Sequence, residues 1–69
     1  MIQYVKTEDG VDHYIVKYEG DELPFFVTPT DRDANEVSVS PGLMQLLQIS
    51  TSFGNDFAKA LYDLKIINS

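Results

Sequence analysis

Two stretches at the start of the chain alternate apolar and polar residues, the period of a half-buried β-strand. Residues 2–7 and 11–19 are rich in Val, Ile and Tyr, and the tripeptide Glu8-Asp9-Gly10 separates them. A three-residue hairpin loop favours a left-handed last position, which Gly10 adopts without steric cost. The pattern therefore predicts a β-hairpin, with the cross-strand pairs Tyr4–Tyr14, Ile2–Val16 and Lys6–Asp12.

A second hairpin is predicted directly after the first. Gly20-Asp21 fits a two-residue type II′ turn, in which glycine takes the first central position. This register puts Pro24 at a hydrogen-bonded position opposite Lys17, where proline cannot donate. A loop longer by two residues removes the conflict and leaves every side chain on its face. The predicted pairs are Tyr18–Leu23, Val16–Phe25 and Tyr14–Val27, and the apolar face of the three-stranded meander collects Ile2, Tyr4, Tyr14, Val16, Tyr18, Leu23, Phe25 and Val27.

The next segment leads from the sheet into a helix. Residues 28–35, which include Pro29, are predicted to form a polar loop, and the alternation in residues 36–40 predicts a short fourth strand. Ser40-Pro41 then provides a hydroxyl for an N-cap and a proline for the first helical position. The helix that follows has an apolar stripe of Leu43, Leu46, Leu47 and Ile49.

A second helix is predicted near the end of the chain. Residues 50–54 interrupt the first helix, and Asn55 can cap the second, in which Lys59 and Asp63 form an i,i+4 pair. Its apolar positions are Phe57, Ala60, Leu61, Leu64 and Ile67. The expected fold is a single α+β domain over residues 1–69, with a small antiparallel three- to four-stranded sheet followed by two short helices packed on one face.

Composition places the chain among compact globular domains and gives it an uneven charge. It has 69 residues, 43% of them hydrophobic, no cysteine and a formal net charge of −6. Residues 1–36 hold nine acidic and three basic side chains and so carry all of that charge, whereas residues 37–69 sum to zero. We find no secretory signal or membrane-spanning run, so we expect a cytoplasmic protein, which includes the host cytoplasm if the protein is viral.

Calcium binding is the one metal chemistry that a local motif favours. Asp31, Asp33 and Asn35 match positions 1, 3 and 5 of an EF-hand loop. Position 6 is Glu36 where the turn needs glycine, and position 12 is Gly42 where a bidentate glutamate belongs. We therefore expect no metal site.

Catalytic chemistry finds little support in the chain. His13 is the single histidine, and no spacing gives it a nucleophile or a second acid. The carboxylates gather at turns, where they stay hydrated and ionised, and no phosphate-binding or nucleophile-elbow motif is present. We expect neither enzymatic activity nor a cofactor. Direct nucleic-acid binding is not expected either, because the aromatic strands lie in the acidic half.

The sheet face opposite the predicted core is the remaining feature. Val5, Ile15 and Phe26 should point there, with Gln3, His13 and Lys17 around them. An uncovered aliphatic and aromatic cluster marks a protein contact. The fourth strand or the chain ends could equally fold over it.

These features lead to two functional hypotheses. The first is a small acidic interaction module that binds, and inhibits or regulates, a basic nucleic-acid-handling partner, as a phage- or mobile-element-encoded DNA mimic would. Its candidate contacts are Glu19, Asp21, Glu22, Asp31, Asp33 and Glu36 together with the Val5/Ile15/Phe26 face. The second is a self-associating assembly protein that uses the Val5/Ile15/Phe26 face to form a homo-oligomer.

Overall fold

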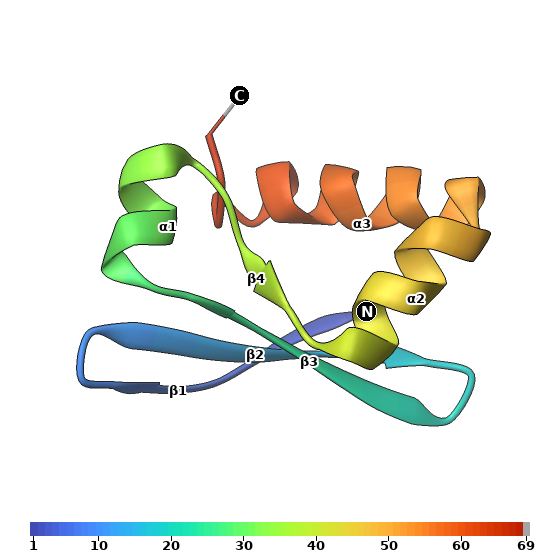
Figure 1. Ribbon diagram of the computed structural model, residues 1–69, viewed down its shortest axis with the longest axis horizontal. Coiled ribbons are helices and arrows are strands. Elements are labelled where there is room, and N and C mark those ends of the chain that lie inside the picture. Colours follow the sequence, from blue (N-terminus) through green and yellow to red (C-terminus); the bar gives the residue numbers. More distant parts are fainter. Residues whose placement is uncertain (69) are drawn as a thin grey trace.

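The protein is a two-layer α+β structure, described for residues 1–68 by a computed structural model. Its four strands are β1 (Ile2–Glu8), β2 (Val11–Tyr18), β3 (Asp21–Val27) and β4 (Ser38–Val39), and its helices are α1 (Pro29–Ala34), α2 (Pro41–Ile49) and α3 (Thr51–Asp63). The strands form one antiparallel open sheet in the order β1-β2-β3-β4. Figure 1 shows the sheet as one layer and the three helices together on one side of it. The predicted α+β class and the fourth strand are confirmed.

The core lies between the sheet and the helices. Seven apolar side chains are buried there: Val16, Phe25, Val27, Leu43, Phe53, Phe57 and Leu61. Phe25 is fully buried, stacks on Tyr14 at 5.0 Å between ring centroids and meets Phe57 edge-on at 5.2 Å. The predicted apolar face therefore supplies the sheet side of the core, with one exception. Tyr4 remains 56% exposed because it lies on the edge strand, where it touches Tyr14 from the side.

Both hairpins close with turns other than those predicted, and the first turn is one residue shorter. Asp9-Gly10 has φ values of 53° and 78°, and Glu19-Gly20 has 49° and 85°, the paired left-handed conformation of a type I′ turn. Types I′ and II′ both match the right-handed twist of the strands, but with Gly10 and Gly20 at the second central position both hairpins adopt type I′ in place of the predicted three-residue loop and the predicted type II′ turn.

The turns change the register but not the faces of β2 and β3, whereas the bulge in β1 moves Lys6 to the face of His13. The Tyr4–Tyr14 and Ile2–Val16 pairs are confirmed, whereas a bulge between Tyr4 and Lys6 makes the predicted Lys6–Asp12 pair wrong. Beyond the bulge, Lys6 lies opposite His13, and Thr7 lies opposite Asp12. In the second hairpin the register moves by two residues, to Val16–Leu23 and Tyr14–Phe25. A two-residue shift keeps each side chain on its side of the sheet.

Pro24 is accommodated by this register. It lies opposite Ile15. Hydrogen-bonded and non-hydrogen-bonded pairs alternate along an antiparallel ladder, beginning here with the hydrogen-bonded pair Tyr18–Asp21 that closes the two-residue turn. The alternation places Pro24 at a non-hydrogen-bonded position, where its missing N–H costs nothing on the β2 side. Its carbonyl accepts a hydrogen bond from the Ser40 N–H at 3.1 Å, which anchors the start of α2 to the sheet.

The segment predicted as a polar loop contains helix α1, so that expectation was wrong. The Thr28 hydroxyl accepts from the Asp31 N–H at 3.0 Å, and the Asp31 carboxylate accepts from the Thr28 N–H at 3.0 Å. This reciprocal capping box satisfies two amide groups that a helix start leaves open. Pro29 takes the first helical position, where its fixed φ favours a helix.

The two later helices are confirmed, with a different junction. Ser40 caps α2 as predicted, but Ser50, not Asn55, caps α3, because its hydroxyl accepts from the Phe53 N–H at 3.1 Å. Because α3 begins at Thr51, earlier than predicted, Phe53 lies within the helix and joins the core. The sequence pattern did not predict a core position for Phe53.

Two positions of the predicted apolar stripes are exposed. Ile49 is 74% exposed because it ends α2, and Leu64 is 56% exposed because α3 ends at Asp63. The predicted Lys59–Asp63 pair is present, with 2.8 Å between the Lys59 Nζ and an Asp63 carboxylate oxygen.

Candidate functional site: the β2–β3 turn and the outer sheet face

The acidic residues singled out from the sequence separate into two groups. Glu19, Asp21 and Glu22 lie at the β2–β3 turn, whereas Asp31, Asp33 and Glu36 lie in and just after α1. These two regions are at opposite ends of the longest axis of the molecule, which measures 30 × 24 × 19 Å (Figure 1). The two groups therefore form separate candidate contacts.

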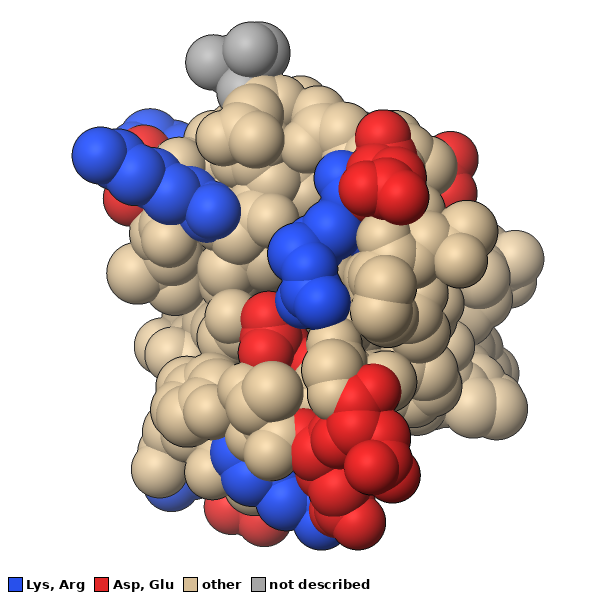
Figure 2. All heavy atoms as spheres, turned by 90° about the vertical axis from the view of Figure 1, so that its left-hand side faces the viewer, with Lys and Arg blue, Asp and Glu red and all other residues tan. Residues whose placement is uncertain are grey.

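At the α1 end, acidic and basic side chains alternate. The Arg32 guanidinium donates to an Asp12 carboxylate oxygen at 2.9 Å and to the Gly10 carbonyl at 2.6 Å, which ties α1 to the β1–β2 turn. Lys6 and Glu8 form a second ion pair at 2.6 Å. Figure 2, which faces this end, shows blue and red side chains intermixed rather than a continuous acidic surface.

Asp31 has a structural role at this end. Besides capping α1, its carboxylate accepts a hydrogen bond from the Ser38 hydroxyl of β4 at 2.7 Å. Hydrogen bonds from the Thr28 backbone and from Ser38 hold the pKa of Asp31 below its ordinary value. The carboxylate is thus already engaged, and it joins α1 to the edge of the sheet.

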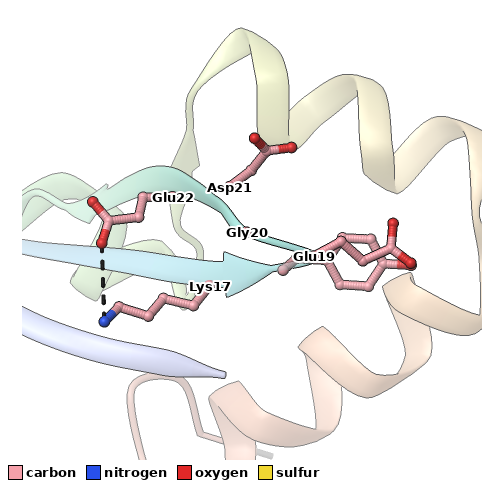
Figure 3. Close-up of a pocket in the computed structure, with 6 residues that line it drawn as sticks. Lys17, Glu19, Gly20, Asp21 and Glu22 are labelled. Carbon is pink, nitrogen blue, oxygen red and sulfur yellow. Dashed lines mark ion pairs between the residues drawn. The ribbon is translucent and has the colours of Figure 1, made fainter.

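The β2–β3 turn presents its carboxylates with little compensation. Lys17 is the nearby cation, and its Nζ lies 3.9 Å from a Glu22 carboxylate oxygen. Within residues 1–68, Glu19 and Asp21 form no ion pair. Figure 3 shows the three carboxylates pointing in different directions, with a dashed line only between Lys17 and Glu22. Such a spread does not converge on one metal ion, but it can meet several cationic groups.

Three shallow hollows meet at this turn, and Tyr18 borders each of them. One is formed by the turn itself, a second lies toward the start of α3 and includes Asp56, and a third lies between the turn and α2. The third is lined by Tyr18, Glu19, Asp21, Leu23, Gly42, Gln45, Leu46 and Ile49. We call this part of the molecule, with Lys17, Glu19, Asp21, Glu22 and Asp56 as its charged groups, the acidic turn end.

Sequence analysis missed part of the acidic turn end. Tyr18 packs against the core as predicted but also borders the three hollows, whereas Ile49 was predicted as a core position and Asp56 was not singled out. The detectable signal was the position of Ile49 at the last turn of α2, directly before Ser50, where a stripe no longer faces the sheet.

The second candidate is the sheet face that points away from the helices. By alternation along β2 and β3 it comprises Val11, His13, Ile15, Lys17, Glu22, Pro24 and Phe26. Strand β1 adds Gln3, which lies opposite Ile15, and, after the bulge, Lys6 and Glu8. We call this set the outer face. Phe26 is 36% exposed, and its ring lies 6.0 Å from that of His13. Val5, 51% exposed, is at the bulge beside it.

No part of residues 1–68 folds over the outer face. Strand β4 pairs edge to edge with β3, and the Met1 carbonyl continues the β1–β2 ladder by accepting from the Lys17 N–H at 2.8 Å. Near the other chain end, the Asn68 N–H donates to the Asn35 side chain at 2.7 Å, beside α1. Figure 1 shows open space below the sheet.

Within residues 1–68, no three His, Asp or Glu side chains group around a point where a metal ion could sit. No helix among those described has the length and apolar character needed to cross a membrane.

Comparisons with protein-family models, with curated proteins and with solved structures return no match to this chain.

Proposed function

We propose that this protein is a small interaction module that binds a basic region of a partner protein through the acidic turn end and thereby inhibits or regulates that partner. The observation that carries the proposal is the pair Glu19 and Asp21. Both carboxylates lie at a hollowed end of the molecule without an ion-pair partner in residues 1–68.

The charge of the acidic turn end supports a basic partner. Its four carboxylates face one lysine, and that lysine is 3.9 Å from Glu22. Uncompensated charge of one sign at a concave surface attracts the opposite charge, and it raises the association rate and the selectivity for a basic surface. The separated carboxylates match a surface that carries several Lys or Arg groups, as clefts that bind nucleic-acid phosphates do.

The backbone of the turn supports binding as well. A two-residue type I′ turn between paired strands holds Glu19 and Asp21 in place before a partner arrives. Because these residues need no further backbone ordering, association loses less conformational entropy than it would for a flexible acidic tail. The rigidity thus favours a defined partner over general attraction to cations.

The hollow between the turn and α2 adds an apolar contact. Ile49 is 74% exposed and lines this hollow together with Leu23 and the two carboxylates. An aliphatic side chain next to carboxylates suits a basic segment that also carries an apolar residue. The apolar contact contributes affinity that salt does not screen, and the carboxylates supply the salt-dependent part.

A matched pair of double variants tests the proposal. Glu19→Lys with Asp21→Lys reverses two charges at the acidic turn end, and Asp33→Lys with Glu36→Lys makes the same change in net charge at the α1 end. Partners are captured on the tagged protein from a lysate of the source cells at low salt, released at high salt, identified by mass spectrometry, purified and titrated. We expect the first variant to lose at least about tenfold in affinity and the second to bind nearly as the wild type does.

Two outcomes contradict the proposal. If both double variants bind as tightly as the wild type, charge at either end is irrelevant. If the α1-end variant shows the larger loss, the contact lies at the wrong end. The regulatory part is tested by adding the protein to the purified partner with a labelled nucleic-acid duplex. Failure to displace the duplex at saturation argues against competition with phosphates.

A further inference from the structure

We infer that the outer face binds a second copy of this chain, so that two sheets pack face to face. The inference does not involve Glu19 or Asp21, because Glu19 lies in the turn and Asp21 opposes Tyr18 on the other side of the sheet. The outer face does share Lys17 and Glu22 with the acidic turn end. A dimer formed in this way leaves Glu19 and Asp21 of both copies available to a basic partner.

The apolar content of the outer face is the first argument. Val11, Ile15, Pro24 and Phe26 lie on neighbouring positions of two paired strands, and Phe26 remains 36% exposed. An antiparallel sheet can leave one face in water, but that face is then normally polar. A second sheet packed about 10 Å away would remove these side chains from water.

The size of the existing core is the second argument. Seven side chains make up the buried core of this 69-residue chain. Domains of this length bury a smaller fraction of their surface than larger ones, and association is one of the ways in which they gain further burial. The outer face is the side of the sheet on which that burial is still missing.

The charge of the outer face identifies the occupant. Its charged groups are two ion pairs, Lys6–Glu8 at 2.6 Å and Lys17–Glu22 at 3.9 Å. They sum to zero, so the net charge of −6 resides on the remaining side chains. Two copies of an acidic protein repel each other least through a neutral surface. A basic partner, in contrast, finds no net attraction there.

The arrangement of these pairs also suits a symmetric contact. Lys6 and Glu8 lie toward the β1–β2 turn, and Lys17 and Glu22 lie toward the β2–β3 turn. Each end of the face thus offers one cation and one carboxylate. When an end of the outer face meets either end of the outer face of a second copy, a lysine can lie opposite a glutamate. This is the self-complementarity that a two-fold interface requires.

Light scattering of the full chain over a wide concentration range tests the inference. We expect the mass to rise from the monomer value of 7.8 kDa toward twice that value. Phe26→Asp should raise the dissociation constant of the dimer by at least about tenfold. Ile49→Asp is the matched control, because it places the same charge on an exposed apolar residue on the helix side. A wild-type chain that stays at the monomer mass, or an Ile49→Asp effect as large as that of Phe26→Asp, overturns the inference.

A second measurement covers the case in which Phe26→Asp does not fold. Amide NMR spectra of the wild type are recorded during dilution, and the resonances of Val11, Ile15 and Phe26 should shift while those of α3 stay in place. Shifts confined to the helices contradict the inference. High salt separates this contact from the proposed function: the apolar dimer should persist, whereas binding of a basic partner through the acidic turn end should weaken.

Discussion

Phe25 and Phe26 are neighbours in the sequence, yet they occupy the two opposite faces of β3. Phe25 is fully buried and touches Tyr14 and Phe57. Phe26 is 36% exposed and has His13 as its aromatic neighbour. The strand conformation suits both rings equally, because large aromatic side chains favour a pleated surface. Their difference comes from the helices, which cover one face of the sheet only.

The comparison shows how one apolar pattern can serve two purposes. On the inner face, aromatic and aliphatic residues stabilise the fold, because three helices bring further apolar groups against them. On the outer face, similar residues contribute little to the fold and remain available for association. Burial, and not residue type, separates a core position from an interface position in this protein.

Replacing each phenylalanine by alanine gives the largest expected contrast. Phe25→Ala should cost about 3–5 kcal/mol, because it leaves a cavity between Tyr14 and Phe57. That is comparable to the whole stability of a domain this small, so we expect Phe25→Ala to be largely unfolded. Phe26→Ala should cost about 1 kcal/mol or less, since part of the ring already contacts water. Urea denaturation at low protein concentration measures both. Equal losses would show that the outer face supports the fold as much as the core does.

The cap of α1 allows a smaller and more local test. Thr28→Ala removes one half of the capping box and should cost the helix about 1 kcal/mol. Because α1 buries no side chain, the effect should appear as faster hydrogen exchange of its own amides and should leave the inner face intact. Ser50→Ala is the control, as it removes the cap of α3, which contributes Phe53 to the core. There the loss should appear as lower global stability. If Thr28→Ala lowered the global stability by a comparable amount, α1 would also stabilise the packing of the helices against the sheet.

The smallest effect concerns pH. Hydrogen bonds to the Asp31 carboxylate lower its pKa in the folded protein, so the ionised form stabilises the fold. This contribution is complete above the ordinary pKa of an aspartate and disappears as the pH falls through the lowered value. Asp31→Asn should therefore flatten the acid side of the stability curve. Asp33→Asn, whose carboxylate makes no hydrogen bond within residues 1–68, is the control. If Asp33→Asn flattened the acid side of the stability curve equally, the hydrogen bonds of Asp31 would not be the cause of the pH dependence.

The faces of β2 and β3 and the existence of α2 and α3 could be predicted because they follow from local periodicity, whereas the bulge in β1 could not. The alternation around Val16 and Phe25 indicates the same faces in any register that shifts by two residues. Ser40-Pro41 marks a helix start through the chemistry of two adjacent residues. The helix over residues 29–34 was missed because its capping box uses Asp31, while the usual signature has glutamate or glutamine at that position.

The candidate site was less accessible from the sequence. Counting carboxylates identified Glu19, Asp21 and Asp31 as equivalent, but a count does not distinguish an engaged group from an available one. Asp31 bonds Thr28 and Ser38, whereas Glu19 and Asp21 have no such partners within residues 1–68. The spacing of Ile49 fits the apolar stripe of a core helix, yet Ile49 ends α2, where it is exposed and lines the hollow beside the β2–β3 turn.

The sequence by itself determined which side chains share a strand face, where α2 begins and that the first half carries the negative charge. These properties depend on the pleat, on capping groups and on composition, all of which act over a few residues. Only the tertiary structure decided that no segment of residues 1–68 covers the outer face, which carboxylates are paired and that the acidic groups lie at opposite ends. Those outcomes depend on contacts between residues far apart in the chain, such as Arg32 with Gly10 and Phe25 with Phe57, because side chains meet there only after the sheet and the helices have packed.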